Sequence, residues 1–143
     1  KENGNECKPK EIGEICGRSP MMMTGYYKKP ELTKKTIVDG WLHSGDLGYL
    51  DEDGFLFLVD RVKDMIISGG INIFPKDIEE IIIQNPAIAE VSVFGVPDKK
   101  WGETPVAAVI LHKEKNISKE ELIKWTNKRV NAKFQRINSL TRI

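Results

Sequence analysis

Two glycine-containing runs constrain the fold of this chain more than any other feature: residues 40–46 (GWLHSGD) and residues 60–75 (DRVKDMIISGGINIFP). Short strand-like segments rich in apolar residues surround both runs, and glycines separate these segments at turns. At Pro75 the apolar residues change to helical spacing. The sequence therefore predicts an α+β chain, in which a β-rich part precedes a small unit with a short sheet and two or more packed helices.

Local signals place the elements along the chain. Strands are predicted over residues 12–18, 47–50, 55–59, 65–68, 90–96, 105–111 and 134–143. An acidic turn that ends in Gly54 predicts a hairpin between the second and third strands, and a short helical turn is expected within residues 31–38. One helix is predicted to begin at Pro75, and another after Ser118, which forms a capping-box pattern with Glu121, to about residue 130.

The order of the predicted elements divides the chain in two near residues 61–63. Residues 1–62 are predicted to be β-rich, and residues 63–143 to form an α+β unit of about 80 residues, a size at which a core is only marginally sufficient. The composition near the border is not that of a flexible linker, so a hinge there is expected to be only a few residues long. Both ends break off inside a pattern, and we expect both to be cuts through a larger protein.

The composition is that of a globular protein, with 40% hydrophobic and 30% charged residues. A net charge of +1 predicts no general attraction to nucleic acid or to a membrane surface. No apolar run approaches the length of a membrane span, and the charged N-terminal segment is not a signal peptide. The two cysteines follow no scaffold or metal-site spacing, so no metal site is expected and a cytoplasmic location is predicted.

Several residues are predicted to have structural roles only. Cys16 follows Ile12 and Ile15 and is expected to be a buried thiol. The methionines at positions 21–23 are expected to be buried near the edge of a core. His43 is expected to pack or to bond the backbone, with no chemical role.

An acid and an arginine mark the two diagnostic runs. Asp46 follows a Ser-Gly turn, where a carboxylate can accept both hydrogen bonds of a ribose diol or can bond its own backbone. Arg61 ends a strand, and its guanidinium suits ribose oxygens and a nearby phosphate; the alternative is a salt bridge with Asp60 or Asp64, which contributes little if exposed. By itself, Asp46 is expected to bond its own backbone, and Arg61 leaves both interpretations open.

The glycine pair and one tryptophan are open to two interpretations in the same way. Gly69 and Gly70 form a tight turn or allow a ligand to approach the backbone closely. Trp101 lies beside lysines, where its ring can stack on an adenine or cover the edge of the sheet.

Taken together, the two runs resemble the adenylate-forming superfamily, which includes acyl-CoA synthetases, the adenylation domains of peptide synthetases and luciferases. These enzymes activate a carboxylate with ATP as an acyl-adenylate and then pass the acyl group to a thiol. The resemblance implies that residues 1–62 are the C-terminal end of the large adenylate-binding domain. It also implies that residues 63–143 are the small mobile C-terminal domain, truncated before the loop that carries the catalytic lysine.

The resemblance also implies roles for single residues. Asp46 and Arg61 would bind AMP or ATP, with Asp46 holding both ribose hydroxyls, and Lys63 would be the hinge. The residues implied for CoA are Gly70 at its pantetheine arm and Trp101, Phe134 and Arg136 near its nucleotide. The residues Lys76-Asp77 depart mildly from the family pattern, and no catalytic residue and no metal ligand are implied within the chain.

The function implied is that of an ATP-dependent acyl-CoA synthetase, an AMP-forming acid–thiol ligase of the kind found in fatty acid metabolism. Its cofactors would be ATP with Mg2+ and CoA, and its substrate a carboxylic acid. The chain alone is expected to be inactive and to bind none of them tightly, because the phosphate loop, the acyl pocket and the catalytic lysine are missing. Two alternatives remain: a peptide-synthetase adenylation domain that serves a carrier protein, and a non-catalytic module that binds nucleotide or CoA.

Overall fold

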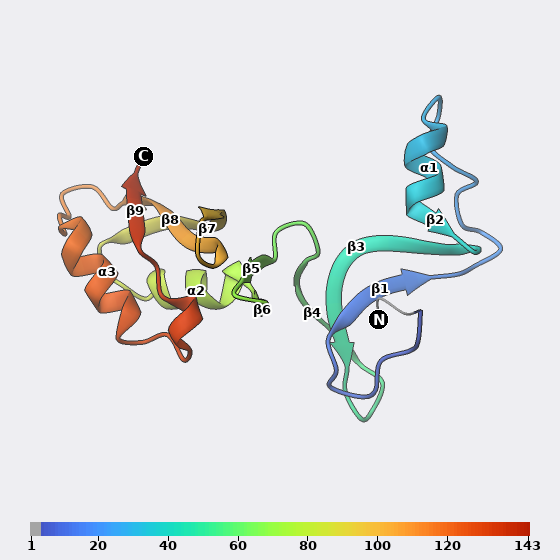
Figure 1. Cartoon of the computed structure of the whole chain (residues 1–143), viewed down its shortest axis with the longest axis horizontal. Coiled ribbons are helices and arrows are strands. Elements are labelled where there is room, and N and C mark those ends of the chain that lie inside the picture. The colour runs from blue at the N-terminus through green and yellow to red at the C-terminus, as the bar shows by residue number, and fades with distance from the viewer. Residues whose placement is uncertain (1–3) are drawn as a thin grey trace. The chain divides into compact units, whose positions relative to one another are not determined.

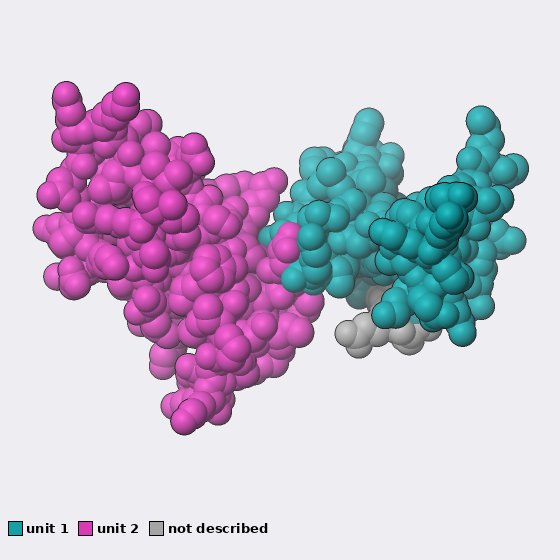
Figure 2. Space-filling view, turned by 90° about the horizontal axis from the view of Figure 1, so that it is seen from above, with its two compact units in different colours: residues 1–63 teal, residues 64–143 magenta. Residues whose placement is uncertain are grey.

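The computed structural model describes residues 4–143, and the chain divides into two compact units, Lys1–Lys63 and Asp64–Ile143. Figure 2 shows each unit in its own colour. The first unit contains mainly strands, and the second combines a sheet with helices (Figure 1). The predicted α+β class is therefore confirmed, whereas the assignment of the two units to a large and a small mobile domain stays a prediction.

The first unit is a sheet built on one long strand. Its elements are β1 (Gly13–Gly17), α1 (Pro30–Thr36), β2 (Ile37–Val38), β3 (Trp41–Leu50) and β4 (Leu56–Arg61). All three other strands pair antiparallel with β3, which is longer than the predicted strand because its first half pairs with β1 and β2. The short helix precedes β2 directly (Figure 1).

The predicted hairpin joins β3 to β4. Asp51 Oδ1 accepts hydrogen bonds from the backbone N–H groups of Asp53 and Phe55, at 3.0 and 2.8 Å. Gly54 has a φ of +84°, a conformation that favours glycine. The acidic turn therefore closes as its sequence predicts.

The first unit has little core of its own. Among the described residues, Leu47 is its only buried hydrophobic residue, while Leu56, Phe57 and Leu58 of β4 are exposed. The predictions of burial for Cys16 and for the methionines are wrong, because Cys16 is exposed and Met21 is 94% exposed. In the part of this unit that the structure describes, these side chains stay uncovered, because apolar character alone does not bury a residue.

The second unit contains a five-stranded sheet and two α-helices. Its elements are β5 (Ile66–Ser68), β6 (Ile71–Ile73), α2 (Pro75–Ile82), β7 (Ile88–Asp98), β8 (Gly102–Leu111), α3 (Lys119–Asn127), the 3-10 turn η1 (Lys133–Gln135) and β9 (Ser139–Arg142). The strand order is β6-β5-β8-β7, and β9 pairs with β8. All pairs are antiparallel except β8 with β9, which is parallel.

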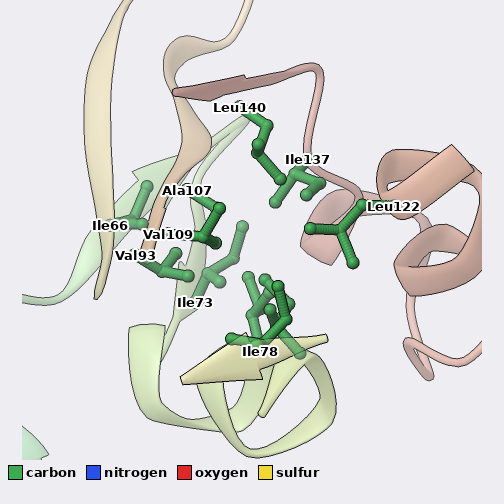
Figure 3. Packing of buried hydrophobic residues seen from close by; sticks show 11 residues of the cluster. Ile66, Ile73, Ile78, Val93, Ala107, Val109, Leu122, Ile137 and Leu140 are labelled. Atoms are coloured by element: carbon green, nitrogen blue, oxygen red, sulfur yellow. The ribbon is translucent and has the colours of Figure 1, made fainter. Parts of the chain in front are cut away.

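One hydrophobic core holds the helices to this sheet. Ile78 of α2, Leu122 of α3 and Val109 of β8 are almost completely buried and belong to a single cluster (Figure 3). Burial of one such aliphatic side chain contributes about 1.5–3 kcal/mol. Unlike the first unit, this unit therefore has a core made from all of its layers.

The helix starts agree with their sequence signals. Pro75 is the first residue of α2. The Ser118 hydroxyl accepts from the Glu121 N–H at 3.1 Å, and the Glu121 carboxylate accepts from the Ser118 N–H at 3.0 Å, which confirms the capping box. Within the described residues, no helix is both long and apolar enough to cross a membrane.

The chain after α3 differs from the prediction. The helix ends at Asn127 rather than near residue 130, and the last strand covers only Ser139–Arg142. The side-chain amide of Asn127 donates to the Ile137 carbonyl and accepts from the Ile137 N–H, both at 2.9 Å. Because this amide takes both backbone groups of Ile137, the segment that contains Phe134 and Arg136 forms a turn instead of a strand.

Candidate nucleotide and acceptor sites

The structure places Asp46 and Arg61 directly opposite each other on neighbouring strands, β3 and β4. The Arg61 Nε lies 3.4 Å from Asp46 Oδ1, and their side chains are 54% and 44% exposed. This ion pair was not among the salt bridges considered from the sequence. A half-exposed carboxylate beside a guanidinium can accept from a diol while the guanidinium donates to a phosphate or a ribose oxygen.

A turn within β3 holds Asp46 in this position. Gly45 has a φ of +77°, which favours glycine, and its carbonyl accepts from the Val62 N–H at 2.9 Å. Its own N–H donates to Glu14 Oε1 at 3.1 Å, and the Asp46 N–H donates to the Ser44 hydroxyl at 3.0 Å. These hydrogen bonds hold the corner formed by Ser44, Gly45 and Asp46, which carries the Asp46 carboxylate, in one conformation.

The aromatic residues of the predicted CoA group meet within the second unit. The rings of Trp101 and Phe134 are in edge-to-face contact, with centroids 5.8 Å apart. Arg136 is exposed and lies two residues beyond Phe134, after the 3-10 turn. The structure therefore brings Trp101 and Phe134 into contact, and Arg136 is near this pair only in the sense that it follows Phe134 closely in the sequence.

Gly69 lies against this aromatic pair, and sequence reasoning did not select it. A Cβ at Gly69 would lie 3.0 Å from Trp101 Cε3 and 3.3 Å from Phe134 Cε1, and its φ is +59°. Gly70, which was selected, has a φ of +78° and open space around the same point. The glycine pair was the available signal, but only the tertiary contact distinguishes its two members.

A tight turn orients Trp101. Asp98 Oδ1 accepts from the backbone N–H groups of Lys100 and Trp101, both at 2.8 Å. The Lys100 Nζ lies 4.7 Å from the centroid of the Trp101 ring, which is a cation–π contact. Because Trp101 is still 40% exposed, an apolar surface with a positive charge beside it faces solvent.

Lys63 and His43 both belong to the first unit. Lys63 is exposed and is the last residue of the first unit. His43 differs from expectation, because its Nδ1 lies 2.6 Å from Glu14 Oε2 and 3.6 Å from the Cys16 sulfur. Partial desolvation of the thiol, followed by the nearby Glu14 carboxylate, raises the pKa of Cys16.

Comparison with known proteins identifies the family. Residues 77–140 match the AMP-binding enzyme C-terminal domain. The chain is 50% identical over 110 residues to the medium/long-chain-fatty-acid–CoA ligase FadD8 of Mycobacterium tuberculosis, covering 77% of this chain and 19% of the relative. It is 46% identical over 123 residues to a 2-succinylbenzoate–CoA ligase of Bacillus cereus, covering 86% of this chain and 25% of the relative.

Solved structures give the same result. The o-succinylbenzoate CoA synthetase MenE of Bacillus subtilis, in complex with the acyl-adenylate intermediate OSB-AMP, has a TM-score of 0.83 and 41% identity, over 96% of this chain and 28% of that chain. Its complex with ATP and magnesium ion has a TM-score of 0.84 and 39% identity, over 99% of this chain and 29% of that chain.

The chain therefore belongs with the adenylate-forming enzymes, as its sequence predicted, and residues 77–140 are an AMP-binding enzyme C-terminal domain. It spans only about a fifth to a quarter of the length of the curated relatives described above.

Proposed function

We propose that this chain is part of an AMP-forming acyl-CoA synthetase, which activates a carboxylic acid as an acyl-adenylate and transfers the acyl group to CoA. The observation that carries this proposal is the half-exposed ion pair of Asp46 and Arg61, which joins the two runs that resemble the family. The names of both curated relatives, which are CoA ligases, support CoA as the acceptor. The acyl-adenylate held by the similar MenE structure supports the intermediate.

In the first step, a carboxylate oxygen attacks the α-phosphorus of ATP, and pyrophosphate leaves. Asp46 accepts hydrogen bonds from the two ribose hydroxyls, and Arg61 donates to a ribose oxygen and to the nearby phosphate. The similar MenE complex contains both ATP and magnesium ion, which supports Mg2+ as the accompanying cation. These contacts bind and orient the nucleotide, and we assign no catalytic residue within the chain.

In the second step, the CoA sulfur attacks the acyl carbonyl, and AMP leaves. The Trp101 ring offers a surface for the CoA adenine, and such stacking contributes about 1–3 kcal/mol. Lys100, which lies over that ring, and Arg136 supply positive charge for the phosphates. The open space at Gly70 allows the pantetheine arm to approach the backbone.

Lys63 is proposed as the hinge residue between the two steps. The units Lys1–Lys63 and Asp64–Ile143 would then be the end of the large adenylate-binding domain and the small mobile domain. A polar, exposed side chain at the border can remain solvated in more than one arrangement of the two units. The chain alone is expected to be inactive, because the function also requires a phosphate loop, an acyl pocket and a lysine.

The substitution Asp46→Ala in the full-length enzyme that carries this chain tests the proposal. Loss of one charged hydrogen-bond acceptor costs about 1.5–3 kcal/mol, so the ATP concentration needed for half-maximal pyrophosphate exchange should rise about tenfold to a hundredfold. Glu52→Ala is the matched control. Glu52 is an exposed acid on the same hairpin, and its surface ion pair with Lys10 does not involve Asp46.

The control variant should require the same ATP concentration as the unmodified enzyme. An unchanged ATP requirement in folded Asp46→Ala protein would remove Asp46 from the nucleotide site. If a panel of carboxylic acids gives adenylate but CoA takes up no acyl group, the acceptor assignment is wrong.

A further inference from the structure

Three potential metal ligands converge in the first unit, outside the residues proposed for nucleotide and CoA. They are Glu14 and Cys16 on β1 and His43 on β3, and their ligand atoms all lie within 4.8 Å of one another. Glu14 and Cys16 are two residues apart on a strand, which places both side chains on one face. Cys16 pairs directly with His43 across the two strands, so the sheet register brings the third residue to the same place.

The distances suit a tetrahedral cation such as Zn2+. Metal–sulfur bonds of about 2.3 Å and metal–nitrogen or metal–oxygen bonds of about 2.0–2.2 Å place neighbouring ligand atoms about 3.3–3.6 Å apart. The Cys16 sulfur is already 3.6 Å from His43 Nδ1, and Glu14 Oε2 is 2.6 Å from the same nitrogen. An increase of about 0.8 Å in the distance between Glu14 Oε2 and His43 Nδ1, which small side-chain rotations can supply, would bring the three ligand atoms to three corners of a tetrahedron.

A catalytic triad is the competing explanation, and the geometry argues against it. In a nucleophile–histidine–acid triad, the nucleophile and the acid contact different ring nitrogens, so that one nitrogen accepts a proton while the other donates. Here both Cys16 and Glu14 contact the same nitrogen, Nδ1 of His43. One nitrogen cannot serve both roles at once, whereas its lone pair can bind a cation placed between the three side chains.

We propose that Glu14, Cys16 and His43 bind a zinc ion, with the fourth position open to water or to a ligand atom from another part of the protein. A thiolate, an imidazole and a carboxylate form a ligand set that zinc accepts. The side chains of Glu14 and His43 are 29% and 36% exposed, and Cys16 is also exposed, so the ion can enter from solvent. The sequence alone predicted no metal site, because Cys16 and His43 are 27 residues apart.

The outer contacts of the proposed site lead to the nucleotide residues. Glu14 Oε1 accepts from the Gly45 N–H at 3.1 Å, so Oε2 can bind the ion while Oε1 keeps its partner. Such a contact from outside the metal shell orients the ligand. Gly45 immediately precedes Asp46, so an ion bound here would stiffen the corner that carries the proposed ribose contact.

Metal titration of the reduced, chelator-treated 143-residue chain tests the proposal. Zn2+ is measured by competition with a chromogenic chelator, and Co2+ is used as a spectroscopic probe. The unmodified chain should bind one ion and show sulfur-to-cobalt charge-transfer absorption. Cys7→Ser is the matched control, because Cys7 is the only other cysteine, and this variant should keep both properties.

Cys16→Ser should lose the charge-transfer absorption. Its zinc affinity should fall by at least the roughly tenfold to hundredfold that loss of an outer-shell partner costs. Equal binding by Cys16→Ser and the unmodified chain would overturn the proposal, as would absence of a one-to-one zinc site in the unmodified chain.

A second measurement needs no variant and therefore does not depend on the folding of one. Zn2+ should slow alkylation of Cys16 but not of Cys7, as followed by mass spectrometry of peptides from the unmodified chain. Equal alkylation of Cys16 with and without Zn2+ would refute the site.

Discussion

Gly69→Ala and Gly70→Ala form a matched pair that measures the contact between the glycine turn and the aromatic residues. Both positions have left-handed backbone, with φ of +59° and +78°, so alanine costs each about 1–2 kcal/mol of conformational strain. The positions differ in their surroundings. At Gly69 the added methyl would lie 3.0 Å from Trp101 Cε3, whereas at Gly70 it would meet nothing within 4 Å.

The difference in unfolding free energy between the two variants is therefore the cost of placing a methyl group against the aromatic rings. Overpacking typically costs about 1–3 kcal/mol, which predicts a total loss of about 2–5 kcal/mol for Gly69→Ala and about 1–2 kcal/mol for Gly70→Ala. The Gly69 N–H also donates to the Trp101 carbonyl at 2.7 Å. Because of this bond, the backbone of the turn cannot move away from the ring freely.

Urea unfolding of the chain, followed by circular dichroism, gives the two losses in free energy. The near-ultraviolet signal of the folded variants should also change more for Gly69→Ala, because its methyl displaces an aromatic ring. If the two variants lose equal stability, to within about 0.5 kcal/mol, or if Gly70→Ala loses more, the contact between Gly69 and the aromatic pair does not exist in solution.

Two further predictions concern the acceptor site and the helix cap. In the full-length enzyme, Trp101→Ala should raise the apparent constant for CoA about tenfold or more, from loss of about 1–3 kcal/mol of stacking, while pyrophosphate exchange stays nearly unchanged; an equal fall in both activities would make Trp101 a packing residue. In the second unit, hydrogen bonds from the backbone and side chain of Ser118 lower the pKa of Glu121. The contribution of the cap to folding stability is therefore fully present above the ordinary pKa of a glutamate, and it is lost as the pH falls through the lowered pKa of Glu121. Glu121→Gln should flatten this acid-side dependence of the urea midpoint, and an unchanged pH profile would contradict the assignment.

The elements that the sequence predicted correctly depend on residues close together in the chain. The Ser118–Glu121 capping box and the start of α2 at Pro75 are set within a single helical turn. The hairpin before β4 depends only on Asp51 and the glycine at position 54. In each case the hydrogen bonds join groups no more than four residues apart, so a local pattern determines them.

The errors concern contacts between distant residues. The last strand begins later than predicted because Asn127 binds the backbone of Ile137, ten residues away. Cys16 and Met21 are apolar enough for a core, but their exposure depends on which layers cover the first unit. No periodicity in the sequence contains that information.

The pairing of Asp46 with Arg61 shows why the site itself could be predicted only in part. From Leu50 opposite Leu56 to Gly48 opposite Leu58, the hairpin register is regular, and it then shifts by one residue between Leu47 and Gly48. An uninterrupted register would place Asp60 opposite Asp46, and two like charges facing each other across a sheet destabilise it. The extra residue of the bulge brings Arg61 there instead. The family resemblance could name both residues, but the attraction between them depends on this irregularity, since a one-residue slip changes every cross-strand partner.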